Sequence, residues 1–308
     1  MKKFLIKILL FTVAFFLAEK IFYLVLIASP KYEKDKRLEQ VITGKMNKDI
    51  MIIGSSRGAR DIIACQIEDS LGLSTYNLSY QGSDIEFHEF LLRSVLKFNK
   101  KPKMVLLTVD DPVELLSSEL TFRYDRCYPL AKYKYINEEM ILRGEKSFLS
   151  NFLVLARLNK RNFYLWNRDF TDLDRIMDCG SMPISFQREG REYSFINNYE
   201  NYQKINEVPS KIDAFLKFQQ LCITNDIVLY LVFPPNFRAL NRQFENRLRQ
   251  ISDPKTNFFI YDTTNTIYRN KSYYFDESHL ITKGAIVLTN ELIEELRTFP
   301  EQMKQQNN

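Results

Sequence analysis

Histidine, tryptophan and cysteine are scarce in this chain of 308 residues, which has two, one and four of them. No cluster of His, Cys or carboxylate residues has metal-ligand spacing, so the sequence predicts no metal site. The cysteines form no pair motif. In an exported protein we expect a disulfide between Cys127 and Cys179. Cys65 and Cys222 fall within helical patterns and are expected to be buried thiols.

Strong charge of one sign is also lacking, because the formal net charge is only +5 and is spread along the chain. The basic clusters at residues 100–103 and 160–161 are short and are typical of a solvated surface. The composition therefore argues against a nucleic-acid partner. No internal repeat or low-complexity tract interrupts the chain.

Long apolar runs are absent except at the N-terminus, where Lys2 and Lys3 precede an apolar stretch over residues 4–28. A membrane-spanning helix needs about 20 mostly apolar residues, and this stretch is long enough. A small-x-small cleavage site is missing, since Leu26 stands two positions before Ala28, so an uncleaved signal anchor over residues 1–29 is favoured over a cleaved signal peptide. The anchor predicts a single-pass protein of the cell membrane.

The orientation follows from Lys2, Lys3 and Lys7, which favour a cytoplasmic N-terminus and place the rest of the chain on the extracytoplasmic side. Basic residues in the segment 31–37 reduce the difference in positive charge between the two ends of the apolar stretch, which weakens the orientation argument. Glu19 and Lys20 interrupt the apolar stretch. Such a pair can dock against a multi-pass membrane protein, or it can neutralise itself at shallow depth and thin the bilayer locally.

The remaining residues suit a short stalk followed by one large domain. Residues 30–47 are polar and predict a stalk or short helix, and residues 301–308 form a polar tail. Residues 48–300 predict one α/β domain with a loosely patterned insertion at 114–209. Predicted strands at 51–53, 74–78, 104–109, 227–233 and 258–261 alternate with helical patterns at 60–71, 83–98 and 210–225, with one that ends near 251, and with a last one at 283–298. This alternation predicts a three-layer, flavodoxin-like fold with a parallel five-stranded sheet.

The candidate nucleophile is Ser56, in the run Ile52-Ile53-Gly54-Ser55-Ser56-Arg57-Gly58. A buried strand that runs directly into a helix exposes backbone N–H groups and the positive end of the helix dipole. A serine in this position can attack a carbonyl while its own N–H holds the oxyanion.

The candidate base is His279, which follows Asp276 by three residues near the C-terminus. An aspartate at this spacing can orient the imidazole and stabilise its charged form. Because the carboxyl ends of parallel strands share one edge of the sheet, Ser56, Asp276 and His279 are expected to meet there. The other histidine, His88, lies beside Phe87 and Phe90 in a helical pattern and is expected to be a packed or surface residue.

These motifs resemble those of the SGNH or GDSL-like hydrolase superfamily over roughly residues 49–297. Gly54-Ser55-Ser56 is similar to its first block, although Ser55 stands where the family has Asp. The segment Asn77-Leu78-Ser79-Tyr80-Gln81-Gly82 is similar to the second block, and Asp276 with His279 matches the last. The family's Gly-x-Asn-Asp block has no counterpart, because Thr108-Val109-Asp110-Asp111-Pro112 follows the third strand.

The resemblance implies roles for several residues. Ser56 would be the nucleophile, and the N–H groups of Ser56 and Gly82 would form the oxyanion hole. Ser83 to Glu86 form a capping box, which places Gly82 just before a helix. Residues that could contact substrate are Ser55, Arg57, Asp110, Asp111 and Asn236. Alternatively the two aspartates cap a turn before Pro112, and Asn236 caps the next helix, which is the interpretation we favour for it.

Residues 147–170 are rich in Phe and Leu. This pattern favours a helix that covers the sheet, with an acyl-chain pocket or a membrane-facing flap as alternatives. Residues 168–202 are polar and aromatic, and predict a loop-rich insertion near the substrate.

The Gly-Ser-Ser form is closest to membrane-anchored SGNH-like proteins of cell-envelope acylation systems, including those of teichoic acid D-alanylation and alginate acetylation. The expected function is therefore serine-dependent transfer or hydrolysis of a small acyl group, most simply acetyl, on a cell-surface or exported polysaccharide. No cofactor is needed. The resemblance implies a multi-pass membrane acyltransferase as a partner. The alternatives are a non-catalytic glycan-binding or assembly scaffold and a plain secreted esterase, which the anchor disfavours.

Overall fold

The computed structural model describes residues 1–117, 119–163, 173, 175–188, 190, 192–197 and 201–297. The chain divides into two compact units. One comprises Met1–Glu39 and Arg123–Asp169, and the other comprises Gln40–Phe122 and Phe170–Asn308. The polar tail at 301–308 lies outside the described residues.

The larger unit contains the predicted five-stranded sheet, and all of its strand pairs are parallel. The spatial order is β2-β1-β3-β4-β5, the flavodoxin-like order. The strands are β1 (Ile50–Ile53), β2 (Thr75–Asn77), β3 (Met104–Thr108), β4 (Val228–Phe233) and β5 (Asn257–Ile260). β1, β2 and β3 are buried along their whole length. Burial on both faces explains the nearly continuous apolar sequence of β1 and β3, whereas β2 is the polar segment Thr75-Tyr76-Asn77. The predicted fold class is confirmed.

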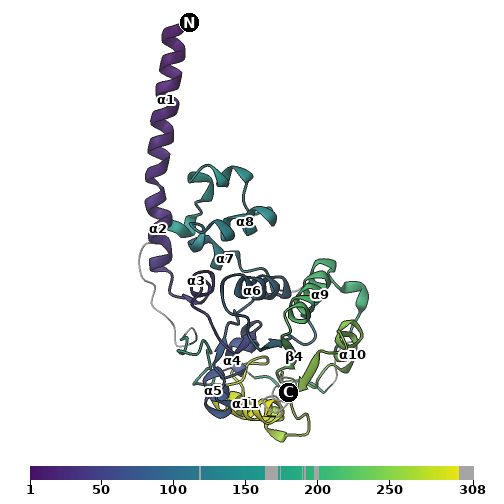
Figure 1. Cartoon of the computed structure of the whole chain (residues 1–308). Helices are drawn as coiled ribbons and strands as arrows, with labels where there is room; N and C mark the ends of the chain where they lie inside the picture. The colour runs from purple at the N-terminus through teal and green to yellow at the C-terminus, as the bar shows by residue number, and fades with distance from the viewer. Residues whose placement is uncertain are drawn as a thin grey trace, which may run out of the picture. The chain divides into compact units, whose positions relative to one another are not determined.

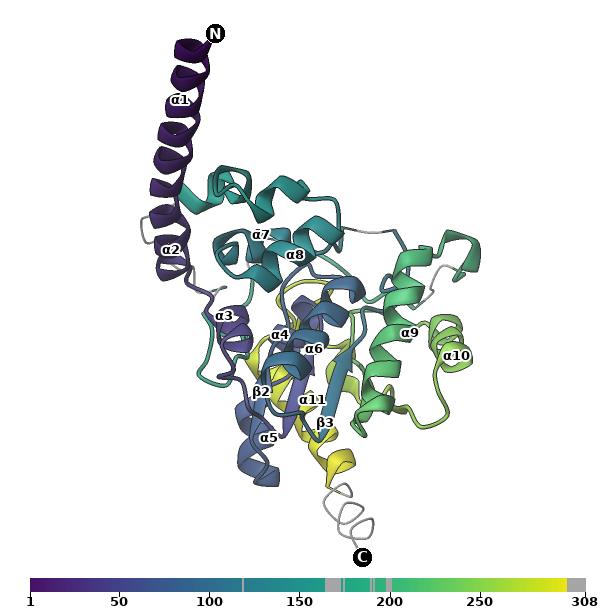
Figure 2. The same cartoon turned by 45° about the horizontal axis from the view of Figure 1, so that its top comes forward.

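The helices of this unit form two groups. α4 (Ser56–Asp61), α5 (Ala64–Leu71) and α11 (Thr282–Leu296) pack together, and α6 (Ile85–Phe98) packs along α9 (Pro209–Thr224). Figure 2 shows α6 and α9 side by side, with α11 behind the sheet. α10 (Arg242–Ile251) joins the second group, since the Gln219 amide of α9 donates to the Ile251 carbonyl. The 3₁₀ helices described here are η6 (Lys204–Asn206), η7 (Thr266–Arg269) and η8 (Lys271–Tyr273).

Two predicted helix caps are wrong. The side chain of Asp84, not Ser83, accepts the Phe87 N–H at the start of α6. Asn241, not Asn236, caps α10 by accepting the N–H groups of Gln243 and Phe244. In both places a polar residue nearer the helix has the extended backbone that an N-cap requires. The predicted helix at 60–71 is also divided, because extended residues separate α4 from α5.

The smaller unit begins with α1 (Lys2–Ile21) and α2 (Tyr23–Tyr32), which together are long and apolar enough to cross a membrane. α3 (Arg37–Ile42) follows at its boundary. The insertion contributes α7 (Tyr124–Cys127), η1 (Tyr128–Leu130), α8 (Lys134–Leu142), η2 (Phe148–Asn151), η3 (Leu155–Arg157) and η4 (Lys160–Phe163). Both η1 and η4 contact α2. Figure 1 shows these teal helices beside the long purple helix.

The sequence-based interpretation of residues 147–170 is therefore wrong in its favoured form. Up to residue 163 the segment makes three 3₁₀ helices that belong to the same unit as the N-terminal helix, rather than one helix on the sheet. Leu165 and Trp166 lie outside the described residues.

The disulfide joins Cys65 to Cys179, so the predicted Cys127–Cys179 bond is wrong. Residues 179–182 lie beside β2 and α4, where the Asn77 N–H donates to the Cys179 carbonyl and the Met182 N–H to the Ala59 carbonyl. This contact brings Cys179 to Cys65 on α5. Gly180 permits it, because its φ is +82° and an added Cβ would lie 2.1 Å from the Asn77 oxygen. Cys127 and Cys222 are buried free thiols.

Removal of the disulfide by the double substitution Cys65→Ala and Cys179→Ala should lower the free energy of unfolding by about 4 to 5 kcal/mol, because the bond closes a loop of 114 residues in the unfolded chain. Urea unfolding followed by circular dichroism measures the change. A reductant should destabilise the wild type and leave the double variant unaffected. A double variant that the reductant still destabilises would contradict this pairing.

Candidate active site

Ser56, His279 and Asp276 form a continuous chain of hydrogen bonds in the larger unit. The His279 Nε2 atom lies 2.8 Å from the Ser56 Oγ, although 223 residues separate them in the sequence. The His279 Nδ1 atom lies 2.8 Å and 3.0 Å from the two carboxylate oxygens of Asp276. A carboxylate only accepts, so Nδ1 carries the proton and Nε2 is free to accept the Ser56 hydroxyl proton.

The turn after β1 positions Ser56. An added Cβ at Gly54 would lie 1.7 Å from the Thr108 Oγ1, and one at Gly58 would lie 2.6 Å from the Ser79 Oγ. Because both positions lack a side chain, the turn lies directly against the end of β3. Ser56 is the first residue of α4, whose repeating hydrogen bonds begin with the Ala59 N–H donating to the Ser55 carbonyl. The Ser56 N–H therefore needs no acceptor within the helix.

A tight loop positions His279. The Phe275 N–H donates to the His279 carbonyl at 2.8 Å, and Asp276 Oδ1 accepts the N–H groups of Ser278 and His279, each at 2.9 Å. Burial opposes ionisation of Asp276, but the hydrogen bond and charge of His279 and these two N–H groups together hold the pKa of Asp276 below its usual value. Asp276 is thus ionised at neutral pH and keeps the imidazole in one orientation.

The sequence interpretation missed Asp61. This carboxylate ends α4, is fully buried, and accepts the Leu280 N–H at 2.9 Å. It therefore connects the helix that carries the serine to the loop that carries the histidine. Burial raises the pKa of Asp61 well above its usual value. No local pattern marks this residue, because its partner is distant in the sequence.

A cavity of about 300 Å³ opens at the triad. Both Ser56 and His279 line it, together with Arg57, Asp110, Asp111, Pro112, Val113, Glu119, Leu120, Asn236, Arg238 and Ser278. Four of the five candidate substrate-contacting residues are thus present. The fifth, Ser55, is fully buried behind the cavity. Gly82 is not among the described lining residues, so its oxyanion role stays a prediction.

Arg57 is the buried cation of the cavity, with 4% of its surface exposed. Its Nη2 donates to the Pro234 carbonyl, and its Nη1 lies 3.8 Å from the Asp110 carboxylate. Among the described residues, Nε and Nη1 have no hydrogen-bond partner. Two donors of a buried guanidinium therefore remain available beside the nucleophile.

Asp110 and Asp111 are held in place by the backbone around them. The Asp110 N–H donates to Glu114 Oε2, and Asp111 Oδ2 accepts the Asn241 N–H. Asn236 donates its amide to the Asp111 carbonyl. Burial, followed by the nearby charge of Glu114, raises the pKa of Asp110. Burial raises the pKa of Asp111 to about 6. Both shifts favour the neutral acid over the carboxylate.

A second Ser-His-acid group lies beneath the nucleophile turn. The His88 Nε2 is 2.8 Å from the Ser83 Oγ, and its Nδ1 is 3.4 Å from Glu114. All three side chains have no exposed surface. The Ser83 hydroxyl also contacts the carbonyls of Tyr80 and Gly54. This group supports the turn and cannot reach a substrate, so His88 is a packed histidine as predicted.

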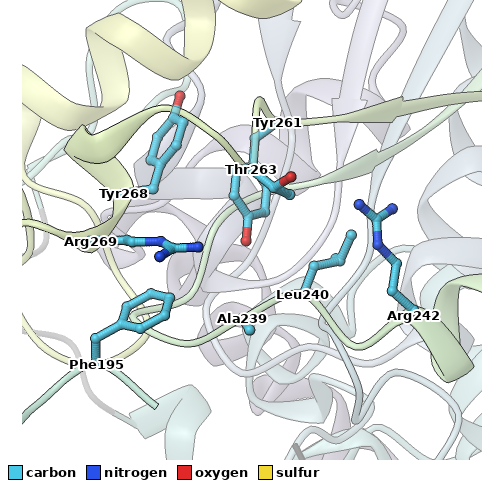
Figure 3. Close-up of a pocket in the computed structure, with 8 residues that line it drawn as sticks. All are labelled: Phe195, Ala239, Leu240, Arg242, Tyr261, Thr263, Tyr268 and Arg269. Atoms are coloured by element: carbon cyan, nitrogen blue, oxygen red, sulfur yellow. The ribbon is translucent and has the colours of Figure 1, made fainter. Parts of the chain in front are cut away.

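A second cavity, of about 200 Å³, adjoins the same loop after β4. The loop gives Asn236 and Arg238 to the triad cavity, and Ala239 and Leu240 to the second. Figure 3 shows the guanidinium groups of Arg242 and Arg269 on opposite sides of this cavity, with Tyr261 between them. The Arg269 guanidinium lies 5.4 Å from the centre of the Phe195 ring.

No group of three or more His, Cys, Asp or Glu side chains within the described part of the chain is arranged to hold a metal ion. No family model matches the chain, and no curated protein shows a significant match to it. The function must therefore be argued from the geometry of the site.

The substitution Asp111→Asn should stabilise the protein increasingly as the pH rises from 4 to 7.5. The folded state holds the Asp111 proton up to a pH of about 6, whereas the unfolded chain loses it near 4, so wild-type stability falls across this window. The difference in free energy of unfolding between the variant and the wild type, measured by urea unfolding, should widen by about 3 kcal/mol over this pH range. If substitution of the exposed Asp213 by Asn widened this difference equally, burial of Asp111 would not be the cause of the pH dependence.

Proposed function

We propose that this chain is a membrane-anchored serine enzyme of the SGNH type. It transfers or removes a small acyl group, most simply acetyl, on a cell-surface or exported polysaccharide. The observation that carries the proposal is the chain of hydrogen bonds from Asp276 through His279 to Ser56, with Ser56 and His279 both lining a cavity.

The reaction has two halves that use the same base. His279 Nε2 accepts the hydroxyl proton as Ser56 Oγ attacks the ester carbonyl, and the protonated imidazole then gives this proton to the departing alcohol. The acyl group is now an ester of Ser56. In the second half, a glycan hydroxyl or water gives its proton to His279 and attacks the acyl-serine. The bond from the acyl carbon to Ser56 Oγ breaks, His279 returns the proton to Ser56 Oγ, and the acylated glycan or the free acid leaves.

The oxyanion formed in each half needs hydrogen-bond donors. The Ser56 N–H is one, and the Arg57 guanidinium is our candidate for the second, because its Nε and Nη1 are buried and make no hydrogen bond among the described residues, although Nη1 lies 3.8 Å from the Asp110 carboxylate. This assignment replaces Gly82. A charged donor within a desolvated site stabilises an oxyanion more strongly than it would in water.

The polysaccharide acceptor is supported by the cavity next to the triad. Aromatic rings and arginines around a shallow cavity suit a sugar ring that carries a carboxylate or phosphate, because the guanidinium groups can form paired hydrogen bonds to either group. Arg238, which lines the triad cavity on the same loop, adds a further positive charge.

Anchoring by the N-terminal helix would keep the enzyme at the cell membrane, with the larger unit on the extracytoplasmic side. A multi-pass membrane acyltransferase is the proposed source of acyl groups, since an anchored transferase needs a donor within reach of the bilayer.

One observation favours a non-catalytic scaffold instead. The triad cavity contains the carboxyl groups of Asp110, Asp111 and Glu119. Ionised carboxylates near Ser56 oppose an oxyanion, so glycan binding without acyl transfer is the second candidate function.

Covalent labelling of the full chain in detergent with a fluorophosphonate probe should modify Ser56 in the wild type. Labelling should disappear in Ser56→Ala and slow by at least about 10²-fold in His279→Ala, because the serine loses its base. Ser210→Ala, which changes an exposed serine at the start of α9, is the control and should still be labelled. Absence of labelling in a folded wild type would favour the scaffold.

The substitution Arg269→Gln should weaken binding of alginate or polyglycerol-phosphate oligomers about 10-fold or more at low salt, because it removes a charge-assisted hydrogen bond. Titration calorimetry with each oligomer measures the affinity. Lys255→Gln, an exposed change of the same charge before β5, should have little effect. Equal losses of affinity in both variants would mean that Arg269 contributes only general electrostatic attraction.

A further inference from the structure

The smaller unit exposes a group of large apolar side chains on η2 and just beyond it. We call Phe148, Leu149 and Phe152 the apolar ridge, and these residues have exposed fractions of 64%, 56% and 61%. The rings of Phe148 and Phe152 contact each other edge to face at 5.5 Å. Water contact at three adjacent side chains of this size is unfavourable, which indicates that the ridge has a partner.

The ridge is fixed to the N-terminal helix through Glu19 and Lys20. Glu19 is 1% exposed and accepts the Leu155 N–H at 2.8 Å. Lys20 pairs with Glu19 at 2.9 Å and donates to the Phe152 carbonyl at 3.0 Å. One residue of the ridge is thus bonded directly to the helix.

Farther along the helix, the insertion is held by apolar packing and one polar contact. Leu26 packs with Ala131 and Val154, and the Asn162 amide donates to the Ser29 hydroxyl. The insertion therefore covers the helix from Glu19 to Ser29, and the ridge lies at the end of this contact that is nearer the exposed apolar residues 4–17.

The length of the helix sets the depth of the ridge. A bilayer core of about 30 Å takes about 20 helical residues at 1.5 Å each. If Lys2 and Lys3 remain at one surface, a core that begins at Phe4 ends near Tyr23. Glu19 and Lys20 then lie inside the far boundary of the core, and the ridge lies at the same level.

We infer that the apolar ridge enters the lipid leaflet that residues 19–23 reach, so that the insertion is an interfacial membrane element in addition to the spanning helix. The ridge suits lipid rather than a polar protein partner, because Glu19 and Lys20 already have their partners within the chain. Phe and Leu side chains at the edge of the hydrocarbon provide apolar burial without hydrogen-bond requirements. The inference rests on membrane anchoring and not on the chemistry of Ser56.

The test uses the full chain reconstituted in phosphatidylcholine and phosphatidylglycerol vesicles. The background substitution Trp166→Phe removes the single native tryptophan, and Phe148→Trp then reports on the ridge. We expect a blue-shifted emission and loss of most of its intensity with phosphatidylcholine brominated near the headgroup end of the acyl chain. Adding Leu149→Ser and Phe152→Ser should reverse much of the quenching.

The matched control is Tyr32→Trp in the same background, about 18 Å farther along the helix from Lys20, which should show little quenching. Carbonate extraction of the vesicles checks insertion of the helix. An inserted protein whose residue 148 reporter is unquenched would overturn the inference, and a protein that carbonate extracts would overturn the membrane anchor with it. Fluorophosphonate labelling of Ser56 is scored separately and can fail or succeed in either case.

Discussion

The close approach of the β1 turn to β3 is the constraint on which the site depends. With no side chain at Gly54, the turn can lie against Thr108, where a Cβ would overlap its hydroxyl. This contact sets the direction in which α4 begins and thus the position of Ser56. The far end of α4 then holds the histidine loop through the bond from Leu280 to Asp61. Two residues at opposite ends of the sequence are brought together by one six-residue helix that is fixed at both ends.

The surroundings of Ser56 contain both a buried guanidinium and buried carboxyl groups, rather than hydrogen-bond donors alone. A buried guanidinium is costly unless anions and carbonyls surround it, and Arg57 has Asp110 and the Pro234 carbonyl close by. The same burial raises the pKa of Asp110 and of Asp111, so each carboxyl group loses its negative charge at a higher pH than an exposed aspartate does. Acyl transfer is therefore compatible with carboxyl groups in this cavity as long as Arg57 keeps its donors. In the proposed mechanism, the arginine next to the nucleophile supplies the second oxyanion donor that the sequence predicted at Gly82.

Local sequence patterns predicted the parts of the molecule that depend on neighbouring residues. Apolar runs identified β1, β3, β4 and β5, and the polar segment of β2 was placed by the alternation of strands with helices, which also identified the parallel sheet. The Asp276-x-x-His279 motif predicted a contact within one loop, which the structure contains. Features that depend on distant residues were missed or wrong. Cys65 pairs with Cys179 because residues 179–182 lie along β2, and Asp61 acts on a loop 219 positions away. The short 3₁₀ helices at 148–163 gave no regular period, so their association with the N-terminal helix had no sequence signal.

Glu19 and Lys20 lie in a helix that is long and apolar enough to cross a membrane, and the insertion provides partners for both charges. From the sequence, the pair indicated either an external polar partner or a shallow, self-neutralised defect. The backbone groups of Leu155 and Phe152 provide the missing partners from within the chain. An unpaired charge at this depth would be costly, whereas a pair that also has backbone partners is tolerated. A multi-pass acyltransferase that associates with this protein would therefore not need to solvate the pair, and its contact surface is more reasonably sought along the apolar residues 4–17 than at the charged positions.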